Sequence, residues 1–91
     1  MSVFWRAKAL ADIRRIVRYI ASDNPVAARQ VGQDLLLAGD SLELFPRRGR
    51  PGRQPGTREL VVTPPYLLVY RVSGADEVTI LRVWHAAQNR P

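Results

Sequence analysis

Five arginines lie close together near the middle of the chain and form its densest group of side chains that could do chemistry. They are Arg47, Arg48, Arg50, Arg53 and Arg58, with no acidic residue between them. A guanidinium group binds a phosphate or a carboxylate through two parallel hydrogen bonds, and the glycines of this segment let its backbone approach a partner closely. We therefore expect residues 47–58, called the arginine segment below, to bind RNA phosphate or an acidic protein surface. The alternative is a solvated basic loop in which Arg50 and Arg53 only anchor local turns.

Nearly all of the excess positive charge of the chain lies in the arginine segment. The net charge of the chain is +6, of which residues 1–46 contribute +1 and residues 59–91 contribute zero. The other five positive charges belong to the arginine segment. Charge concentrated in this way indicates a binding site rather than a diffusely basic surface.

Length and composition exclude several classes of function. A chain of 91 residues, 46% of them hydrophobic, has the size of one domain, residues 1–91. It contains no cysteine, which excludes disulfides and thiolate chemistry. It shows no signal peptide and no apolar stretch near the roughly 20 residues that span a bilayer, so we expect a soluble, cytoplasmic protein without a membrane partner. No acidic or histidine cluster has metal-ligand spacing, and no glycine-rich phosphate loop precedes a helix, so we expect neither a metal nor a cofactor.

The first element that must position the arginine segment is a helix predicted from Arg6. Apolar residues recur there at three- and four-residue steps as far as Ile20, whereas Lys8, Asp12 and Arg15 fall mostly on the opposite side. This pattern predicts an amphipathic helix with Asp12 on its polar face.

A second helix is predicted to follow after a tight turn. Asn24 is a good N-cap and Pro25 suits the first helical position, and an apolar stripe then continues to about Phe45. Gly32 and Gly39 lie seven residues apart on another face of this helix. They predict close packing on the first helix or the sheet; the alternative is a shallow groove that receives a helix of a partner.

The remaining elements are predicted strands. Val3–Trp5 reads as an edge strand, residues 46–56 as an irregular loop, and residues 57–63, 66–72 and 77–85 as three β-rich runs joined by short turns. Short links imply an antiparallel meander. The predicted fold is therefore α+β, in the order β-α-α-β-β-β, with the helical hairpin packed on the antiparallel sheet.

Two cations and four aromatic residues fall within these strands. Arg71 and Arg82 are expected on adjacent strands, pointing to a polar face with an acid between them or to a bound partner, because like charges repel when directly opposite. The aromatic residues are expected in the core, with stacking on bases as the alternative. They are Trp5, Tyr66, Tyr70 and Trp84.

The order and spacing of several short motifs resemble one known family, the RelE/ParE toxins of type II toxin–antitoxin modules, over almost the whole chain. The motifs are Ala11-Asp12-Ile13, Tyr19-Ile20, Asn24-Pro25, Leu44-Phe45-Pro46, Gly49-Arg50-Pro51-Gly52, Gly56-Thr57-Arg58-Glu59-Leu60, Val69-Tyr70-Arg71-Val72 and Val83-Trp84-His85. The Gly-Thr-Arg-Glu-Leu motif and the final Val-Trp-His look most like the ParE branch.

The resemblance implies a toxin held inactive in a hetero-oligomer by a cognate antitoxin, whose acidic C-terminal segment wraps the helical hairpin and sheet. ParE-like members are associated with inhibition of DNA gyrase, whereas RelE-like members cut mRNA on the ribosome. We expect a ParE-like toxin that acts by binding and not by catalysis. A RelE-like mRNA endonuclease is the alternative, and a third is an inactive homologue that serves only in an autoregulatory complex.

The resemblance also assigns candidate residues for the nuclease alternative. Arg58 matches a catalytic arginine that stabilises phosphate charge, Arg82 could assist it, and His85 matches a position at which some relatives carry a general acid or base. A salt bridge of Arg58 with Glu43 or Asp76, and a structural role for His85, are the competing interpretations. The tyrosine after the last strand and the loop lysines of RNA-cutting members are missing here, which favours the binding toxin.

Overall fold

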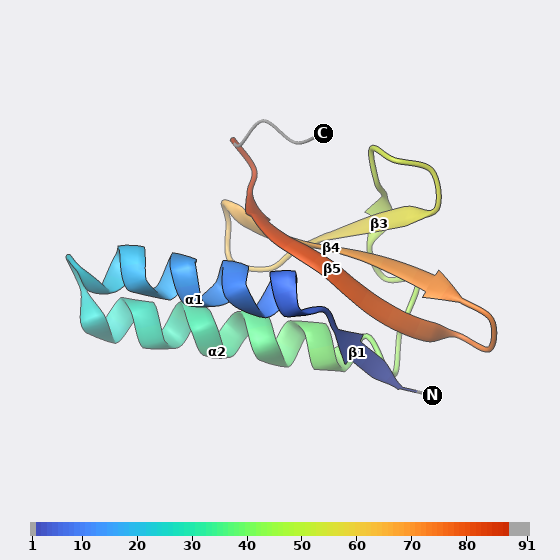
Figure 1. Ribbon diagram of the computed structural model, residues 1–91, viewed down its shortest axis with the longest axis horizontal. Helices are drawn as coiled ribbons and strands as arrows, with labels where there is room; N and C mark the ends of the chain where they lie inside the picture. The colour runs from blue at the N-terminus through green and yellow to red at the C-terminus, as the bar shows by residue number, and fades with distance from the viewer. Residues whose placement is uncertain (1, 88–91) are drawn as a thin grey trace.

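The chain folds as a helical hairpin packed against one face of a five-stranded sheet (Figure 1). The computed structural model describes residues 2–87. The elements are β1 (Val3–Trp5), α1 (Ala7–Ala21), α2 (Pro25–Ser41), β2 (Arg50–Pro51), β3 (Thr57–Val61), β4 (Tyr66–Ser73) and β5 (Glu77–His85). The predicted α+β class and the predicted order of helices and strands are confirmed. No helix in this part of the chain is long and apolar enough to cross a membrane.

The helical hairpin begins as the sequence indicates and ends earlier. The Asn24 side chain accepts a hydrogen bond from the Ala27 N–H at 3.1 Å and caps α2, with Pro25 in the first turn. The prediction that α2 runs to about Phe45 was wrong, because α2 ends at Ser41 and the N–H groups of the next three residues bond carbonyls only three residues back. Leu42, seven residues after Leu35, continues the buried stripe of the helix and is fully buried, whereas Phe45 is 63% exposed.

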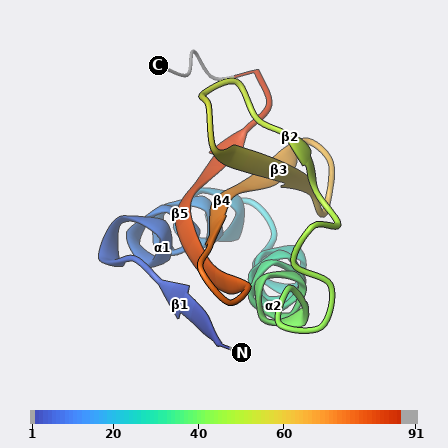
Figure 2. The ribbon, with the colours of Figure 1, turned by 90° about the vertical axis from the view of Figure 1, so that its right-hand side faces the viewer.

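The sheet has the strand order β1-β5-β4-β3-β2 (Figure 2). β3, β4 and β5 form the predicted antiparallel meander, and β1 is the predicted edge strand, parallel to β5. The loop predicted for residues 46–56 was only partly right. Arg50 and Pro51 pair with β3 as the two-residue strand β2. Part of the arginine segment is therefore a strand of the sheet and not a free loop.

A register shift in β5 decides which of its residues enter the core. Ile80 and Val83 are both buried in the core, three residues apart, because Leu81 is one residue too many for the pairing with β4. Strict alternation from Ile80 would have placed Arg82 on the core face. The irregularity puts Val83 there instead and releases Arg82 from the core.

The core lies between the helical hairpin and the sheet face that it covers (Figure 2). Its buried members come from both helices and from β4 and β5; they are Ala9, Ile13, Leu35, Leu42, Leu68, Tyr70, Val78, Ile80 and Val83. The core prediction is confirmed for Tyr70, and Trp5 and Tyr66 pack against this cluster. It was wrong for Trp84, which lies over the other face of the sheet.

Gly32 and Gly39 are buried inside the chain. A Cβ atom on Gly39 would come within 2.3 Å of the Trp5 ring and 2.7 Å of Ile80 Cδ1, and one on Gly32 would lie 3.0 Å from Val17 Cγ2. The missing side chains thus let α2 approach α1, β1 and β5. The alternative, a groove at these glycines that receives a helix of a partner, is not supported, because neither glycine borders open surface.

Candidate functional site

The arginine segment leaves the turn after α2, runs beside the sheet and returns as its outermost strands (Figure 2). Its tip is closed by backbone bonds, from the Gly52 N–H to the Thr57 carbonyl at 2.8 Å and from the Thr57 N–H to the Gln54 carbonyl at 3.2 Å. Gly56 takes a φ of 81°, which favours glycine. These bonds give the segment a defined conformation from which its arginines project.

Arg58 fixes the start of the arginine segment instead of pairing with an acid. Its Nη1 donates to the Gly49 carbonyl at 2.7 Å and to the Arg47 carbonyl at 3.3 Å. The Tyr70 hydroxyl accepts from the Gly49 N–H at 2.8 Å, so this buried glycine is held from both sides. The interpretation of a salt bridge from Arg58 to Glu43 or Asp76 was therefore wrong. Two carbonyl oxygens already occupy one end of the guanidinium that a nuclease would direct at a phosphate.

The other arginines of the segment lie on the surface with weak partners. Arg47 pairs with Asp76 at 2.6 Å and Arg50 with Glu59 at 3.3 Å, and the two arginine side chains are 58% and 61% exposed. Arg48 donates to the Ser41 hydroxyl at 3.0 Å. Exposed ion pairs contribute only about 0–1 kcal/mol, so an incoming carboxylate can replace Asp76 at little cost.

Arg53 borders a hollow of about 220 Å³ on the sheet face away from the helices, lined also by Glu59, Arg82 and Trp84. Glu59 lies on this face and Arg58 on the other, as strand alternation predicts. Trp84 contributes its ring to the hollow, and the Arg82 guanidinium lies 5.2 Å from that ring. The hollow therefore joins arginine and aromatic surface next to the arginine segment.

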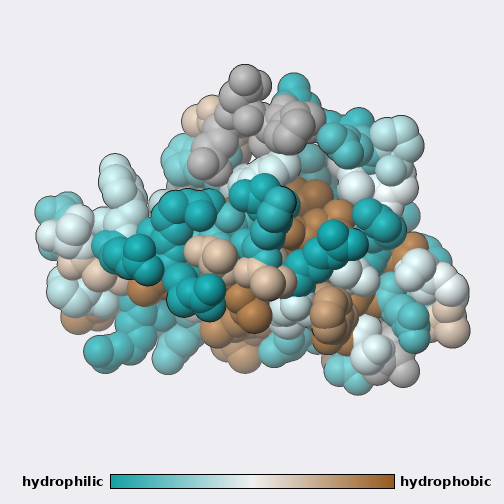
Figure 3. All heavy atoms as spheres, in the orientation of Figure 1, coloured by the Kyte–Doolittle hydropathy of each residue, from teal (hydrophilic) through white to brown (hydrophobic). Residues whose placement is uncertain are grey.

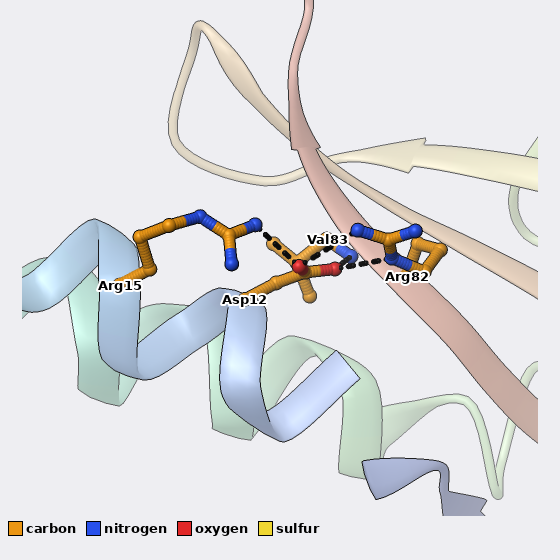
Figure 4. A network of polar contacts seen from close by, with 4 residues as sticks. All are labelled: Asp12, Arg15, Arg82 and Val83. Atoms are coloured by element: carbon orange, nitrogen blue, oxygen red, sulfur yellow. Dashed lines mark hydrogen bonds and ion pairs between the residues drawn. The ribbon is translucent and has the colours of Figure 1, made fainter. Parts of the chain in front are cut away.

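A network of hydrogen bonds and ion pairs centred on Asp12 lies at the edge of β5 (Figure 4). β1 pairs with β5 only as far as Ile80, and α1 then continues along the same edge. There the Asp12 carboxylate accepts the Val83 N–H at 2.9 Å, so it takes the place that another strand would fill. Arg82 donates to the same carboxylate through Nε at 2.8 Å and through Nη2 at 3.0 Å, and Arg15 donates from the next turn of α1.

The balance of burial and hydrogen bonding sets the charge state of this network. Burial raises the pKa of Asp12, but the hydrogen bonds from Arg82, the Val83 N–H and Arg15 outweigh it and hold the pKa below its usual value. The bond to Asp12 in turn raises the pKa of Arg82. Asp12 is only 1% exposed, so the prediction that it lies on the polar face of α1 was wrong. A signal was present, because Asp12 lies three residues after Ala9 and next to Ile13, both in the core.

The two strand arginines do not share an acid between them. Arg71 is exposed and lies opposite Thr57 and Thr79, whereas Arg82 lies opposite Val69 and reaches to α1 for its carboxylate. The prediction of an acid between Arg71 and Arg82 on the sheet was therefore wrong. Arg71 keeps an exposed guanidinium beside the start of β3, where it adds to the charge of the arginine segment.

His85 lies at the far end of the sheet from Arg58. Its Nδ1 accepts a hydrogen bond from the Ala87 N–H at 3.0 Å, and its ring meets the Tyr66 ring edge-on with centroids 5.5 Å apart. His85 lies opposite Tyr66 on β4 and Arg58 lies opposite Tyr70, four residues along the strand. Four residues of β-strand span about 13 Å. The fold therefore does not bring Arg58 and His85 to one reacting phosphate.

This architecture is shared with solved toxin structures. A chain of the chromosomal ParDE toxin–antitoxin system from P. aeruginosa superposes with a TM-score of 0.83 at 31% identity, over 93% of this chain and 95% of that one. The fold is thus that of the RelE/ParE class of toxins. Residues 3–90 match the model of the ParE toxin of the type II toxin–antitoxin system parDE, and the chain belongs to that family.

Two named toxins are similar to this chain over nearly its whole length. The protein Y4kP of Sinorhizobium fredii is 43% identical over 96% of this chain and 90% of its own length. Toxin RelE2 of Caulobacter vibrioides is also 43% identical, over 94% of this chain and 96% of its own length. The names alone therefore leave open whether this toxin acts as a ParE or as a RelE protein.

Proposed function

We propose that the protein is a ParE-like toxin that binds and inhibits DNA gyrase and is neutralised by an antitoxin made with it. The observation that carries this proposal is the dispersal of the three candidate nuclease residues. Arg58 binds backbone carbonyls, Arg82 binds a buried carboxylate, and His85 packs against Tyr66 at the other end of the sheet. Cleavage of RNA needs a base, an acid and charge stabilisation at one phosphate.

The arginine segment supports a binding function. Four of its five arginines are exposed, backbone hydrogen bonds close its tip, and it carries most of the net charge. A rigid cationic edge attracts acidic macromolecules over long range and increases the rate at which they associate. We therefore assign the arginine segment to target recognition.

The helical hairpin supports an antitoxin partner. Large apolar side chains are exposed along it, with Tyr19 and Val26 each 76% exposed and Leu37 69% exposed. Figure 3 shows apolar residues gathered over α2 and β1, below a band of hydrophilic side chains over α1. Exposed apolar area of this kind marks a protein-interaction surface. An amphipathic antitoxin segment that covers it would also place acidic residues within reach of the arginines.

The test compares two purified targets. The toxin is added to bacterial DNA gyrase in a supercoiling assay and, separately, to translating ribosomes with a defined mRNA. We expect supercoiling to be inhibited and the mRNA to stay intact, with inhibition relieved by the product of the adjacent antitoxin gene. Cleavage of mRNA on ribosomes, lost in Arg58→Ala, would refute the proposal.

The RelE-like endonuclease remains the second candidate function, because toxin RelE2 is as similar to this chain as any relative named above. In that case Arg58, Arg82 and His85 would come together only on the ribosome. The same pair of assays separates the two candidates. If the protein affects neither target and does not slow growth on induction, the remaining hypothesis is an inactive homologue that acts in an autoregulatory complex.

A further inference from the structure

The turn between α2 and the arginine segment presents two large apolar side chains directly beside two arginines. Leu44 is 73% exposed and Phe45 is 63% exposed. With Arg47, Arg48 and Asp76 they line an open hollow of about 500 Å³. We call residues 44–48 the corner. The mixture is unusual for a solvated basic loop, in which exposed apolar side chains contribute nothing to solubility.

The corner is held in place by its own hydrogen bonds. The Leu44 N–H donates to the Ser41 carbonyl at 3.1 Å, and the Arg48 N–H donates to the Phe45 carbonyl at 3.2 Å. The Arg48 side chain returns to the Ser41 hydroxyl. Because the backbone is already ordered, a partner that binds here does not have to order it, which favours affinity.

The charges of the corner match an acidic partner. Among the described residues, the Arg48 guanidinium donates only to a hydroxyl group. Arg47 forms an ion pair with Asp76, and both of these side chains are exposed. Carboxylates of a partner can therefore bind Arg48 directly and displace Asp76 from Arg47. A nucleic acid would supply phosphates for the arginines but no apolar pocket for Leu44 and Phe45.

We propose that the corner is the docking anchor of the toxin on its target, with Leu44 and Phe45 entering an apolar pocket of gyrase and Arg47 and Arg48 pairing with carboxylates at its rim. This inference rests on the proposed function and names the part of the arginine segment that makes the contact. The corner continues directly into that segment, whereas the apolar side chains assigned to the antitoxin lie along the helical hairpin. A few well-packed, desolvated side chains, with arginine among the most enriched, carry most of the binding energy of a protein interface.

The experiment compares matched surface variants in the gyrase supercoiling assay. Leu44→Ala/Phe45→Ala removes the anchors, and Leu37→Ala, with a comparably exposed leucine on α2, is the control. We expect the double variant to require roughly tenfold or more protein for half inhibition, and the control to match the wild type. Thermal unfolding of each variant checks that the fold is kept, as expected for changes at exposed side chains.

The possible results of this experiment distinguish the proposed docking through the corner from the proposed inhibition of gyrase. If the wild type inhibits gyrase and the double variant inhibits it equally well, the corner is not the anchor, although the proposed function stands. If the double variant loses affinity for the antitoxin but not for gyrase, the corner belongs to the antitoxin interface and the inference is wrong. If the wild type does not inhibit gyrase at all, both proposals fail.

Asp76→Asn provides an independent test, because the expected result is a gain in affinity for gyrase and not a loss. Asp76 has a φ of 62°, a conformation that Asn adopts readily, so the variant keeps the turn and removes only the charge. Because Asp76 competes with the target for Arg47, we expect the variant to bind gyrase a few-fold more tightly than the wild type in a direct binding measurement. Unchanged or weaker binding would show that Arg47 makes no contact with a carboxylate of the target.

Discussion

Asp12 joins α1 to β5 through one carboxylate that accepts hydrogen bonds from two arginines and a backbone N–H (Figure 4). Replacing it with Asn keeps the shape but removes the charge that both guanidinium groups bind. We expect Asp12→Asn to lower the free energy of unfolding by about 2–3 kcal/mol, because hydrogen bonds to charged groups are the stronger ones. Urea denaturation measures this, and Asp23→Asn, at an exposed position in the turn between the helices, should change it little.

The same residue predicts how stability responds to acid. The folded-state pKa of Asp12 is depressed, so its contribution is fully present above the unfolded-state value of about 3.9 and is lost as the pH falls through the folded-state pKa. The stability advantage of the wild type over Asp12→Asn should therefore be constant near neutral pH and shrink below about pH 4. An advantage that is the same at pH 7 and at pH 2.5 would contradict this assignment.

Arg58 offers a second test at the residue scale. Lysine keeps the charge at this position, but its side chain is one bond shorter and its ammonium falls short of the place from which Nη1 donates to two carbonyls. We expect Arg58→Lys to loosen the start of the arginine segment and to increase amide hydrogen exchange at Gly49 and its neighbours several-fold, as the loss of about 1 kcal/mol of local stability implies. Arg71→Lys, at an exposed position on β4, is the matched control. Equal exchange in all three proteins would mean that Arg58 does not position the segment.

At the scale of the elements, alanine variants of the two glycines of α2 distinguish the effect of close packing from the effect of helix propensity. Alanine is favoured over glycine in a helix by about 1 kcal/mol. At Gly39 the added Cβ would collide with Trp5 and Ile80, and we expect a net loss of about 1–2 kcal/mol because overpacking outweighs that gain. At Gly32 the Cβ meets a single Val17 methyl group, and the two effects should nearly cancel. Thermal unfolding of Gly39→Ala and Gly32→Ala checks the contrast.

The elements were predictable from sequence where a local pattern specifies them. The cap formed by Asn24 and Pro25, the apolar steps of the helices and the β-rich runs after residue 56 all depend on near neighbours in the chain. The end of α2 was not predictable, because the apolar steps continue past Ser41 to Phe45 although the backbone bonding changes there. The two-residue strand β2 likewise exists only because β3 offers it an edge.

The candidate site was less predictable than the fold, for the same reason. The register shift at Leu81 changes the face of the sheet on which Arg82 lies, and no residue type in β5 predicts that shift. Asp12 and Arg82 are 70 residues apart in sequence, so their contact follows from the tertiary fold alone. By contrast, the exposure of Arg47 and Arg50 follows from their place in a charged segment rich in glycine and proline.

At the scale of the whole molecule, the charge is uneven and its effect should depend on salt. The net charge is +6 and most of it lies at one edge of the sheet. The Debye length falls from about 10 Å at 0.1 M salt to about 3 Å at 1 M, so attraction between this edge and an acidic partner should weaken as salt rises. We expect the affinity for the proposed target, gyrase, to fall on the order of tenfold between low and moderate salt. Arg48→Gln should flatten that dependence more than Arg29→Gln, which removes an exposed charge on α2.

The position of β5 has a consequence for the order in which the protein can be made. β5 lies between β1 and β4, so the first strand of the chain joins the sheet only through the last one. A nascent chain that stops before Glu77 contains both helices, the arginine segment, β3 and β4. It lacks three core residues and the edge of β5 to which Asp12 binds. Such a chain leaves β1 without a strand to pair with, and α1 keeps mainly its packing on α2. We therefore expect that a chain must be translated at least through β5 before it can take up the fold that binds a partner.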